Sequence, residues 1–483
     1  MIKLPDQNLT ILQMNDLHGY ITSHQEYFWK GDSQIYEEVG GLAKIAGYFK
    51  MVKEEQEEIL LCDNGDTIHG TYPAVQSKGA NLLPLLNYLA FDSMTAHWEF
   101  AYGPEHLTEF TKKLDYPLLA VNCYDKHTDK RVFPPYKIIE KNNLQIAILG
   151  VAATIVDKTM PKEFSEGIYL TNGIKELQKL TRTLKEEEKI DLVVVLSHMG
   201  YPQECRMAKI IDNIDVFLSG HTHNRMYYPS IINDTILIQS GCHGSFIGRL
   251  DVKVRNRKIV NYTHELVKMD NTIPLDKEMD EKVQSLMITY KDKLNEQVGE
   301  IKTPLTRDKV METTMDNFLL EALKEASGTD IAFSNGWRYG APIPKGPIRV
   351  NDLWNIIPVN PPISICEITG AELLEMMEEN LEHTFSRNPL NQMGGYVKRC
   401  SGINVYFKIE NAENERIQEF FINGKKLNQT KKYKACYVTS QGIPDHYGDK
   451  KEHLDINAID ALHRYLVKHK EVRTELKNTI VPI

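Results

Sequence analysis

A chain of 483 residues is longer than one ordinary domain, and we expect two. Hydrophobic residues make up 42% of the sequence and charged residues 25%, proportions that exclude a disordered chain and allow large buried cores. The net charge of −9 excludes a global basic field able to hold DNA or RNA, but a small anionic substrate remains compatible because a bound metal supplies its own positive charge.

The first third of the chain alternates predicted strands and helices. Residues 9–14 and 59–62 are short apolar runs typical of buried strands, and between them residues 42–52 carry apolar side chains at helical spacing. Two further apolar runs, 192–196 and 214–219, predict strands later in the chain. This alternation predicts an α/β fold with βαβ units around a mixed or parallel sheet.

The pattern changes after residue 235, where alternating, turn-punctuated segments predict antiparallel strands that complete the first domain. A turn-forming segment, Asp270 to Pro274, then precedes a charged helical stretch. We therefore expect three parts: a first domain over 1–268, a linker helix over 269–299, and a second, smaller α/β domain over 300–483.

The spacing of the cysteines and the length of the apolar runs predict the cellular location of the protein. The seven cysteines are scattered and never in CxxC spacing, so neither a disulfide framework nor a zinc knuckle is indicated. The first apolar run is too short for a signal peptide, and no segment approaches the ~20 apolar residues that cross a bilayer. We expect a cytoplasmic protein with reduced thiols and no membrane partner.

Acidic residues and histidines follow most of the predicted strands. Each alone reads as an ordinary loop pair, helix N-cap or core histidine, and only their recurrence after successive strands carries the prediction. Carboxylates and imidazoles without a cysteine ligand suit Mn²⁺, Fe²⁺ or Zn²⁺ and argue against a structural zinc site. The candidates are Asp16, His18, Asp66, a residue near position 97, His198, His221 and His223.

The motifs NDLHG, GDTIHG, SHMG and GHTH, in this order, resemble those of the calcineurin-like metallophosphoesterases. With GGLAKIA and the second half of the chain, the resemblance extends to the 5'-nucleotidase family, which includes UDP-sugar hydrolases and 2',3'-cyclic phosphodiesterases. It implies a four-layer αββα N-terminal domain, a smaller C-terminal substrate domain, and two divalent metals that activate a water.

The resemblance also implies how the metals are shared. One metal would be held by Asp16, His18, Asp66 and His223. Asp66 would bridge to a second metal held by His198, His221 and one residue of the segment that contains His97.

This third segment departs from the family. The family motif GNHEFDYG reads AHWEFAYG here, which puts His97 at the position of a metal-binding Asn, Trp98 at the catalytic His and Ala101 at its Asp partner. An unshifted alignment would keep His97 as the catalytic histidine, but it puts the Glu-Phe and Tyr-Gly pairs out of register. No catalytic side chain then remains beside the metal-activated water, a loss that commonly lowers rates by ~10²–10⁴-fold. The HWEF variant is similar to that of the SoxB thiosulfohydrolases, which act on a sulfur ester.

The second domain departs as well. Arg307 and Arg338 stand at family arginine positions that bind the substrate phosphate. Val359 stands where the family has one of two Phe rings that sandwich the nucleotide base, and the other Phe has no counterpart. Trp337, Trp354 and Tyr396 could supply aromatic surface instead or could be core residues. The predicted substrate-binding residues are Arg307, Asn335, Arg338, Tyr396 and Asp445.

We expect a dinuclear-metal phosphoesterase that hydrolyses a nucleotide or a related phosphomonoester. Two alternatives remain open: hydrolysis of a non-nucleotide phosphate or a sulfur ester, and a metal-binding protein whose catalytic activity has been lost. The expected cofactors are two divalent ions of Mn, Zn or Fe, and the expected partner is a small phosphate ester rather than a nucleic acid polymer.

Overall fold

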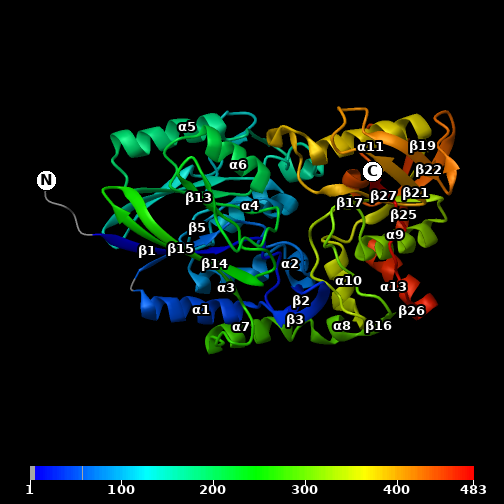
Figure 1. Ribbon diagram of the computed structural model, residues 1–483. Helices are drawn as coiled ribbons and strands as arrows, with labels where there is room; N and C mark the ends of the chain where they lie inside the picture. The colour runs from blue at the N-terminus through cyan, green and yellow to red at the C-terminus, as the bar shows by residue number, and fades with distance from the viewer. Residues whose placement is uncertain (1–5, 57) are drawn as a thin grey trace.

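The computed structural model describes residues 6–56 and 58–483. The chain forms two halves that lie side by side, the first coloured blue to green and the second mainly yellow to red (Figure 1). Within these residues no helix is both long and apolar enough to cross a membrane.

Two sheets form the centre of the first half. The first sheet has the order β15-β14-β1-β4-β5. Its strands are β1 (Gln7–Met14), β4 (Ile59–Asp63), β5 (Ser93–Met94), β14 (Phe246–Arg255) and β15 (Lys258–Lys268). The second sheet has the order β12-β13-β11-β10-β8-β7. Its strands are β7 (Tyr136–Lys141), β8 (Leu144–Val151), β10 (Leu192–Ser197), β11 (Val216–Leu218), β12 (Ser230–Ile232) and β13 (Thr235–Ile238). Five of these strands precede the candidate ligands. Among them, β1, β4 and β5 run parallel to one another in the first sheet, and β10 and β11 do so in the second.

The two sheets pack face to face because alternate residues of their strands are apolar. Ile11 and Leu60 of the first sheet share a buried cluster with Ile146 and Val194 of the second. The opposite face of the second sheet, which includes Val193, is covered by helices α5 (Ile174–Arg182) and α6 (Tyr201–Ile210). Helices α1 (Leu42–Glu55), α3 (Leu83–Leu89) and α7 (Lys277–Met287) cover the outer face of the first. The expected four-layer αββα sandwich is confirmed, with α5 and α6 above and α1 below in Figure 1.

Shorter elements decorate the sandwich. They are the hairpin β2 (His24–Lys30) and β3 (Ser33–Val39), the pair β6 (Cys123–Asp125) and β9 (Ile168–Leu170), helices α2 (Tyr72–Gln76) and α4 (Pro104–Thr111), the 3-10 turns Ala80–Leu82, Trp98–Tyr102 and Lys162–Ser165, and a π turn Thr183–Glu187.

The connection between the halves differs from the single helix expected over 269–299. It contains α7, capped by the Asp276 carboxylate that accepts from the Met279 amide at 2.7 Å, and a separate short helix α8 (Lys291–Asn295). Strand β16 (Gln297–Ile301) already begins inside the predicted linker. The sequence did not predict β16 because this strand forms by pairing with β18 (Gly346–Arg349), which is distant in the chain and cannot be inferred from the local sequence pattern.

The second half is built around a five-stranded sheet of order β20-β17-β24-β19-β25. Its strands are β17 (Ile331–Gly336), β19 (Pro362–Thr369), β20 (Tyr396–Ser401), β24 (Lys432–Tyr437) and β25 (Asp449–Asn457). One face packs on α9 (Thr314–Ser327) and α13 (Ala458–His469), and the other on α11 (Gly370–Phe385). This is the expected smaller α/β domain. The remaining elements are α10 (Val350–Ile356), α12 (Thr439–Gly442), a 3-10 turn Pro389–Asn391, β26 (Glu471–Val472), and the sheet of β21 (Ile403–Phe407), β22 (Ile417–Ile422), β23 (Lys425–Lys426) and β27 (Ile480–Pro482).

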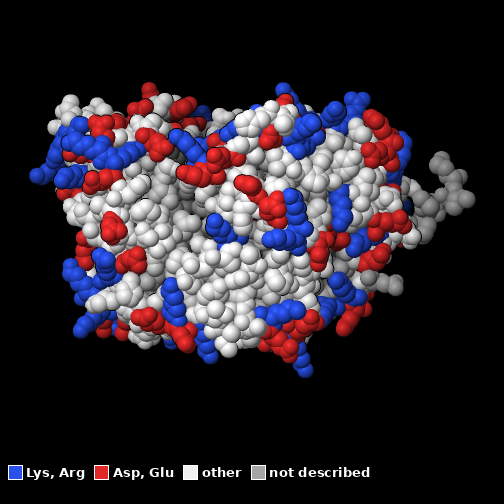
Figure 2. Space-filling model, turned by 180° about the vertical axis from the view of Figure 1, so that it is seen from behind, with Lys and Arg blue, Asp and Glu red and all other residues white. Residues whose placement is uncertain are grey.

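The charged side chains on one face are mixed in sign. Figure 2 shows Lys and Arg interspersed with Asp and Glu around a largely uncharged central region. This face therefore presents no continuous basic track of the kind that follows a nucleic acid backbone.

Candidate metal centre and interdomain cavity

The seven predicted ligands lie just beyond the carboxyl ends of five strands. Asp16 and His18 follow β1, Asp66 follows β4, and His97 follows β5. In the second sheet His198 follows β10 directly, and His221 and His223 follow β11. The neighbouring strands are parallel, so their carboxyl ends meet at one edge, which brings these side chains together.

The candidate ligand atoms form two neighbouring groups. Asp66, His97, His198 and His221 offer atoms within 4.8 Å of one another, and so do Asp16, His18 and His223. Asp66 Oδ2 lies between the groups, 3.7 Å from His18 Nε2, 3.0 Å from His97 Nδ1 and 3.1 Å from His198 Nε2. One carboxylate oxygen thus faces both groups, which is the position a bridging ligand needs.

Five of the seven ligands adopt a left-handed backbone conformation that side chains usually avoid. Asp16, His18, Asp66, His221 and His223 have φ between 50° and 71°. Asp and His tolerate this region better than most residues, but each such residue still costs of order 1 kcal/mol or more. Backbone hydrogen bonds hold the turns in place, among them Asp16 N to Gly65 O at 3.0 Å and Gly19 N to Thr67 O at 2.9 Å.

Surrounding groups orient the ligands. His198 Nδ1 donates to the Asn64 carbonyl at 2.6 Å, which leaves Nε2 free to bind a cation. Glu99, fully buried in the HWEF motif, accepts from the amides of Asp66 at 3.2 Å, Thr67 at 2.6 Å and His97 at 2.8 Å. A single carboxylate therefore ties together the two loops that carry Asp66 and His97.

The chemistry of the donor set fits divalent cations. Burial alone would lower the pKa of His198, but the carboxylates of Asp66 and Asp16 outweigh it and raise the pKa to about 10. Burial lowers the pKa of His18 to about 3, so this imidazole is neutral. His18 Nδ1 and His97 Nε2 are buried without a hydrogen-bond partner among the residues described. Two ionised carboxylates, a neutral His18 and unpartnered ring nitrogens suit a divalent ion, which would displace the proton of His198.

A cavity of about 780 Å³ opens from this centre into the second half of the molecule. His18, Asp66, His97, His221 and His223 line it from the first half. Of the predicted substrate residues, Asn335, Arg338, Tyr396 and Asp445 line it from the second. Arg338 Nη1 lies 3.4 Å from His221 Nε2, and its guanidinium stacks over the Tyr396 ring at 4.7 Å. Asp445 lies at the exposed rim and pairs with Lys162 at 3.4 Å.

Arg307 differs from its expected role in substrate binding. Its guanidinium is buried away from the cavity lining and donates to Asp316 at 2.9 Å, to the Tyr339 carbonyl at 2.6 Å and to the Ile356 carbonyl. The second arginine on Asp316 is Arg399, at 2.9 Å. Three of its five N–H donors are used inside the protein, which holds the guanidinium in the fold of the second half and outside the cavity lining.

Trp98, which the motif alignment puts at the position of the catalytic histidine, lines the cavity. Its amide donates to Asp66 Oδ1 at 2.7 Å, and its ring stacks on His69 with centroids 4.7 Å apart. Ala101 is partly buried and packs against the surrounding core. The indole therefore fills the space beside the metal centre and presents no acid or base to it.

Sequence reasoning missed Lys398 and assigned no role to His69. Lys398 lines the cavity two residues after Tyr396 on β20, so strand periodicity could have placed both side chains on one face. Trp337 lines the cavity, whereas Trp354 is buried and packs on Tyr72. Val359 is outside the cavity lining.

An αββα sandwich with carboxylates and imidazoles gathered at its strand ends defines the class of metallophosphoesterases. Residues 9–225 match the family described as calcineurin-like phosphoesterase, and residues 297–440 match the 5'-nucleotidase C-terminal domain. The chain therefore combines a calcineurin-like phosphoesterase domain with a 5'-nucleotidase C-terminal domain, as its motifs predicted.

Individual relatives are distant. The trifunctional nucleotide phosphoesterase protein YfkN of Bacillus subtilis is 23% identical over 87% of this chain, but the chain spans only 30% of that protein. A structure of the sulfate thiohydrolase SoxB of Thermus thermophilus superposes with a TM-score of 0.91 at 22% identity, covering 99% of this chain and 97% of that one. A 5'-nucleotidase precursor from Thermus thermophilus superposes with a TM-score of 0.87 at 21% identity, covering 99% of each chain. These structures share the fold of this chain.

Proposed function

We propose that the protein is a hydrolase that uses two divalent cations, Mn, Zn or Fe, to cleave a small phosphomonoester. The observation that carries the proposal is the position of Asp66 Oδ2, which faces His18 of one ligand group at 3.7 Å and His198 of the other at 3.1 Å. Bound at such a centre, the cations polarise the ester and acidify the attacking water.

The residues of the chain bind and orient the substrate. Arg338 presents its guanidinium beside His221, where it can donate to the non-bridging oxygens of an ester held at the centre. Trp98 and the second half of the molecule narrow the access of solvent to the same place. On this proposal residues 1–268 hold the metals, 269–299 connect the domains, and 300–483 bind the substrate, in a cytoplasmic enzyme whose seven thiols are free.

Nucleotides are the family's expected substrates, but the cavity offers them little stacking surface. The Tyr396 ring lies under the guanidinium of Arg338 at 4.7 Å, with that of Arg399 at 5.4 Å. Trp337 is only 4% exposed, and one face of Trp98 is covered by His69. We therefore propose a phosphomonoester whose recognition depends on polar groups rather than on a base held between two rings.

Hydrolysis of a sulfur ester is the second candidate. Trp98 occupies the catalytic histidine position, and the HWEF segment that contains it is similar to that of the thiosulfohydrolases. A sulfonate has three oxygens that Arg338 could bind as it would bind those of a phosphate. The same cavity and metals would serve this reaction.

The decisive experiment strips the protein of metal, reloads it with Mn²⁺, Zn²⁺, Fe²⁺ or Co²⁺, and assays nucleoside monophosphates, a cyclic nucleotide, UDP-glucose, sugar phosphates and an S-sulfonate. Asp66→Asn serves as the blank and Asp32→Asn, an exposed carboxylate outside the cavity lining, as the matched control. We expect the wild-type protein to release phosphate from a non-nucleotide ester. The control variant should keep this activity and the Asp66→Asn variant should lack it. Turnover of the S-sulfonate alone would favour the second candidate, and no turnover with two metals bound would exclude both.

A further inference from the structure

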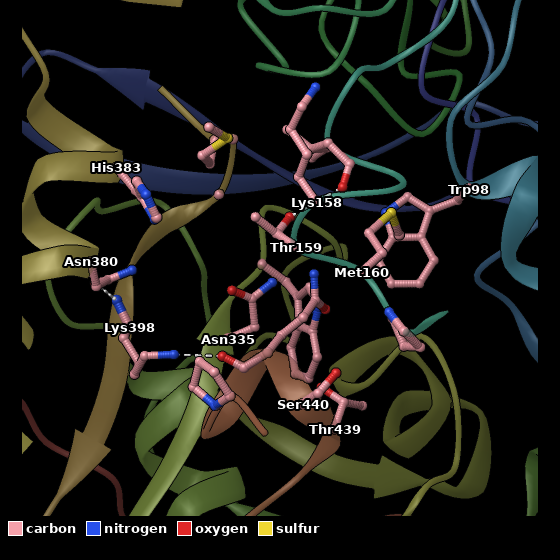
Figure 3. A pocket seen from close by; sticks show the side chains of 18 of the residues that line it. Trp98, Lys158, Thr159, Met160, Asn335, Asn380, His383, Lys398, Thr439 and Ser440 are labelled. Carbon is pink, nitrogen blue, oxygen red and sulfur yellow. Dashed lines mark hydrogen bonds between the residues drawn. The ribbon is translucent and has the colours of Figure 1, made fainter. Parts of the chain in front are cut away.

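Lys398 is a buried cation that faces the cavity. It is only 5% exposed and lines the cavity from β20 (Figure 3). Its backbone amide donates to Asn380 Oδ1 at 2.7 Å, and its ammonium donates to the Gln441 carbonyl at 2.5 Å. An ammonium has three donors, so this single neutral acceptor leaves most of its capacity unused.

No carboxylate within the described chain pairs with this ammonium at the 4.0 Å limit of an ion pair. The acidic side chain that acts on it, Glu379, is directed elsewhere: its Oε2 accepts from the Tyr447 hydroxyl at 3.1 Å and lies 3.8 Å from His446 Nε2. Burial lowers the pKa of Lys398 to about 8, as expected for a cation without a partner. A buried charge without a counterion is destabilising, and a ligand that supplies the missing negative charge would offset this cost.

Lys398 continues a row of cationic groups that starts at the metal centre. Arg338 lies 3.4 Å from His221 and stacks on Tyr396. Tyr396 and Lys398 are two residues apart on β20, so their side chains point to the same face and are separated by about 7 Å along the strand. The row therefore runs from the metal ligands through Arg338 to Lys398.

The wall near Lys398 is polar, and its acidic member beside Lys398, Glu379, is the carboxylate already engaged with Tyr447 and His446. In Figure 3 Asn380 and Asn335 lie beside Lys398, and Thr439 and Ser440 line the same cavity farther away. The indole Nε1 of Trp337, buried in the same lining, has no partner among the residues described and remains an available donor. A buried cation and unpaired donors suit an anionic, oxygen-rich group.

We propose that the substrate carries a second anionic group, separate from the ester that reacts, and that Lys398 binds it. This inference rests on the proposed function, because the metal centre defines where the reacting ester lies. The substrate class is therefore a phosphomonoester that also bears a carboxylate, sulfonate or second phosphate on a short polar chain.

The test measures binding of phosphonates, which a phosphoesterase does not hydrolyse, to the metal-loaded protein by calorimetry. Phosphonoacetate, phosphonopropionate and phosphonobutyrate vary the distance between the two anionic groups, and methyl-, ethyl-, propyl- and butylphosphonate lack the second one. We expect one phosphonocarboxylate to bind about tenfold to a hundredfold more tightly than its alkyl counterpart, the range expected for a hydrogen-bonded charge.

Lys398→Met should abolish this gain while leaving the affinity for methylphosphonate unchanged, which also shows that the variant is folded. Lys158→Met is the matched control, because Lys158 lines the same cavity with a side chain that is 40% exposed and 3.9 Å from Asp157. It should keep the full gain.

Two results would overturn the role of Lys398: no gain at any spacer length in the wild-type protein, or an equal gain in Lys398→Met. Failure of methylphosphonate to bind, together with no hydrolysis of any ester, would instead overturn the proposed function itself. The two failures are thus distinguishable in one set of titrations.

Discussion

At the scale of single residues, Glu99 shows how a side chain that binds no metal shapes the centre. Its carboxylate accepts three amides from the two loops that carry Asp66 and His97. Burial raises the pKa of Glu99, and the Asp66 carboxylate raises it further, while the amides that donate to it lower it. These bonds fix the direction in which the two ligands point.

Glu99→Gln is expected to weaken metal binding about 10–100-fold without unfolding the protein, because one amide NH₂ would face the backbone N–H groups. Metal affinity measured by competition with a chelator checks this. Glu105→Gln, in the same region but on α4, should leave the affinity unchanged. An unaltered affinity in Glu99→Gln would show that the loops hold their shape without this carboxylate.

The two family arginines should respond differently to mutation. Arg307→Ala removes a partner of the buried Asp316 and should lower the free energy of unfolding by about 3–5 kcal/mol. Arg338→Lys keeps the charge but loses the planar fork and the stacking on Tyr396, so KM should rise about tenfold with little change in stability. Urea unfolding and steady-state kinetics on both variants separate the roles. If an Arg307 variant is stable but has a raised KM, Arg307 contributes to substrate binding.

His198 links metal binding to pH. In the metal-free protein its pKa is raised from 6.5 to about 10, so its protonated form stabilises the fold fully below pH 6.5, and this contribution is lost as the pH rises toward 10. A divalent ion must displace that proton. We expect proton release on metal loading at pH 7, detected by titration in buffers of different ionisation enthalpy. The metal-free protein should also lose stability from pH 7 to 10 more steeply than the loaded protein. Equal slopes would contradict this assignment.

At the scale of elements, the packing of the linker on helix α1 depends on one glycine. A Cβ on Gly47 would lie 1.9 Å from the Pro274 carbonyl oxygen, and Asp276 N donates to the Ala43 carbonyl at 2.9 Å. The linker therefore packs so closely on α1 that position 47 has room only for glycine. The expected helix over 42–52 is present, but nothing in its apolar spacing indicates that a second segment covers it.

Gly47→Ala should destabilise the protein by about 1–3 kcal/mol, because the overlap outweighs the better helix propensity of alanine, about 1 kcal/mol. Thermal and urea unfolding measure the change. Lys53→Ala, at an exposed position of the same helix, should have little effect. A stabilised Gly47→Ala variant would mean that the linker moves aside at no cost.

At the scale of the whole molecule, the second half reaches directly into the metal centre. Gly394, in the loop before β20, packs so closely on His221 that a Cβ there would lie 2.4 Å from His221 Nε2. Gln203 Nε2 donates to the Gln392 carbonyl of the same loop at 3.1 Å. The ligand set belongs to the first half, but the second half limits the space around one of its members.

Gly394→Ala should therefore reduce activity at least about tenfold, because the new methyl group meets a metal ligand and φ is +66°. Gly31→Ala is the matched control, since Gly31 has φ +65° and nothing within 4 Å of an added Cβ. Both variants share the backbone strain, so a difference in metal content or kcat reports the contacts of the new methyl group with His221 and with Ile155, 2.9 Å away. Equal losses would assign the effect to strain alone.

The sequence by itself determined the α/β class and six of the predicted ligands, because an apolar run of strand length followed by Asp or His repeats at β1, β4, β10 and β11. The αββα arrangement and His97 were implied by the resemblance of its motifs to a known family. Only the tertiary structure showed that Arg307 is buried on Asp316, that β16 interrupts the predicted linker, and that Lys398 and Gly394 face the cavity. Each depends on contacts between segments, within the second half for Arg307 and β16 and between the halves for Gly394, and the pattern of one segment does not specify its partner.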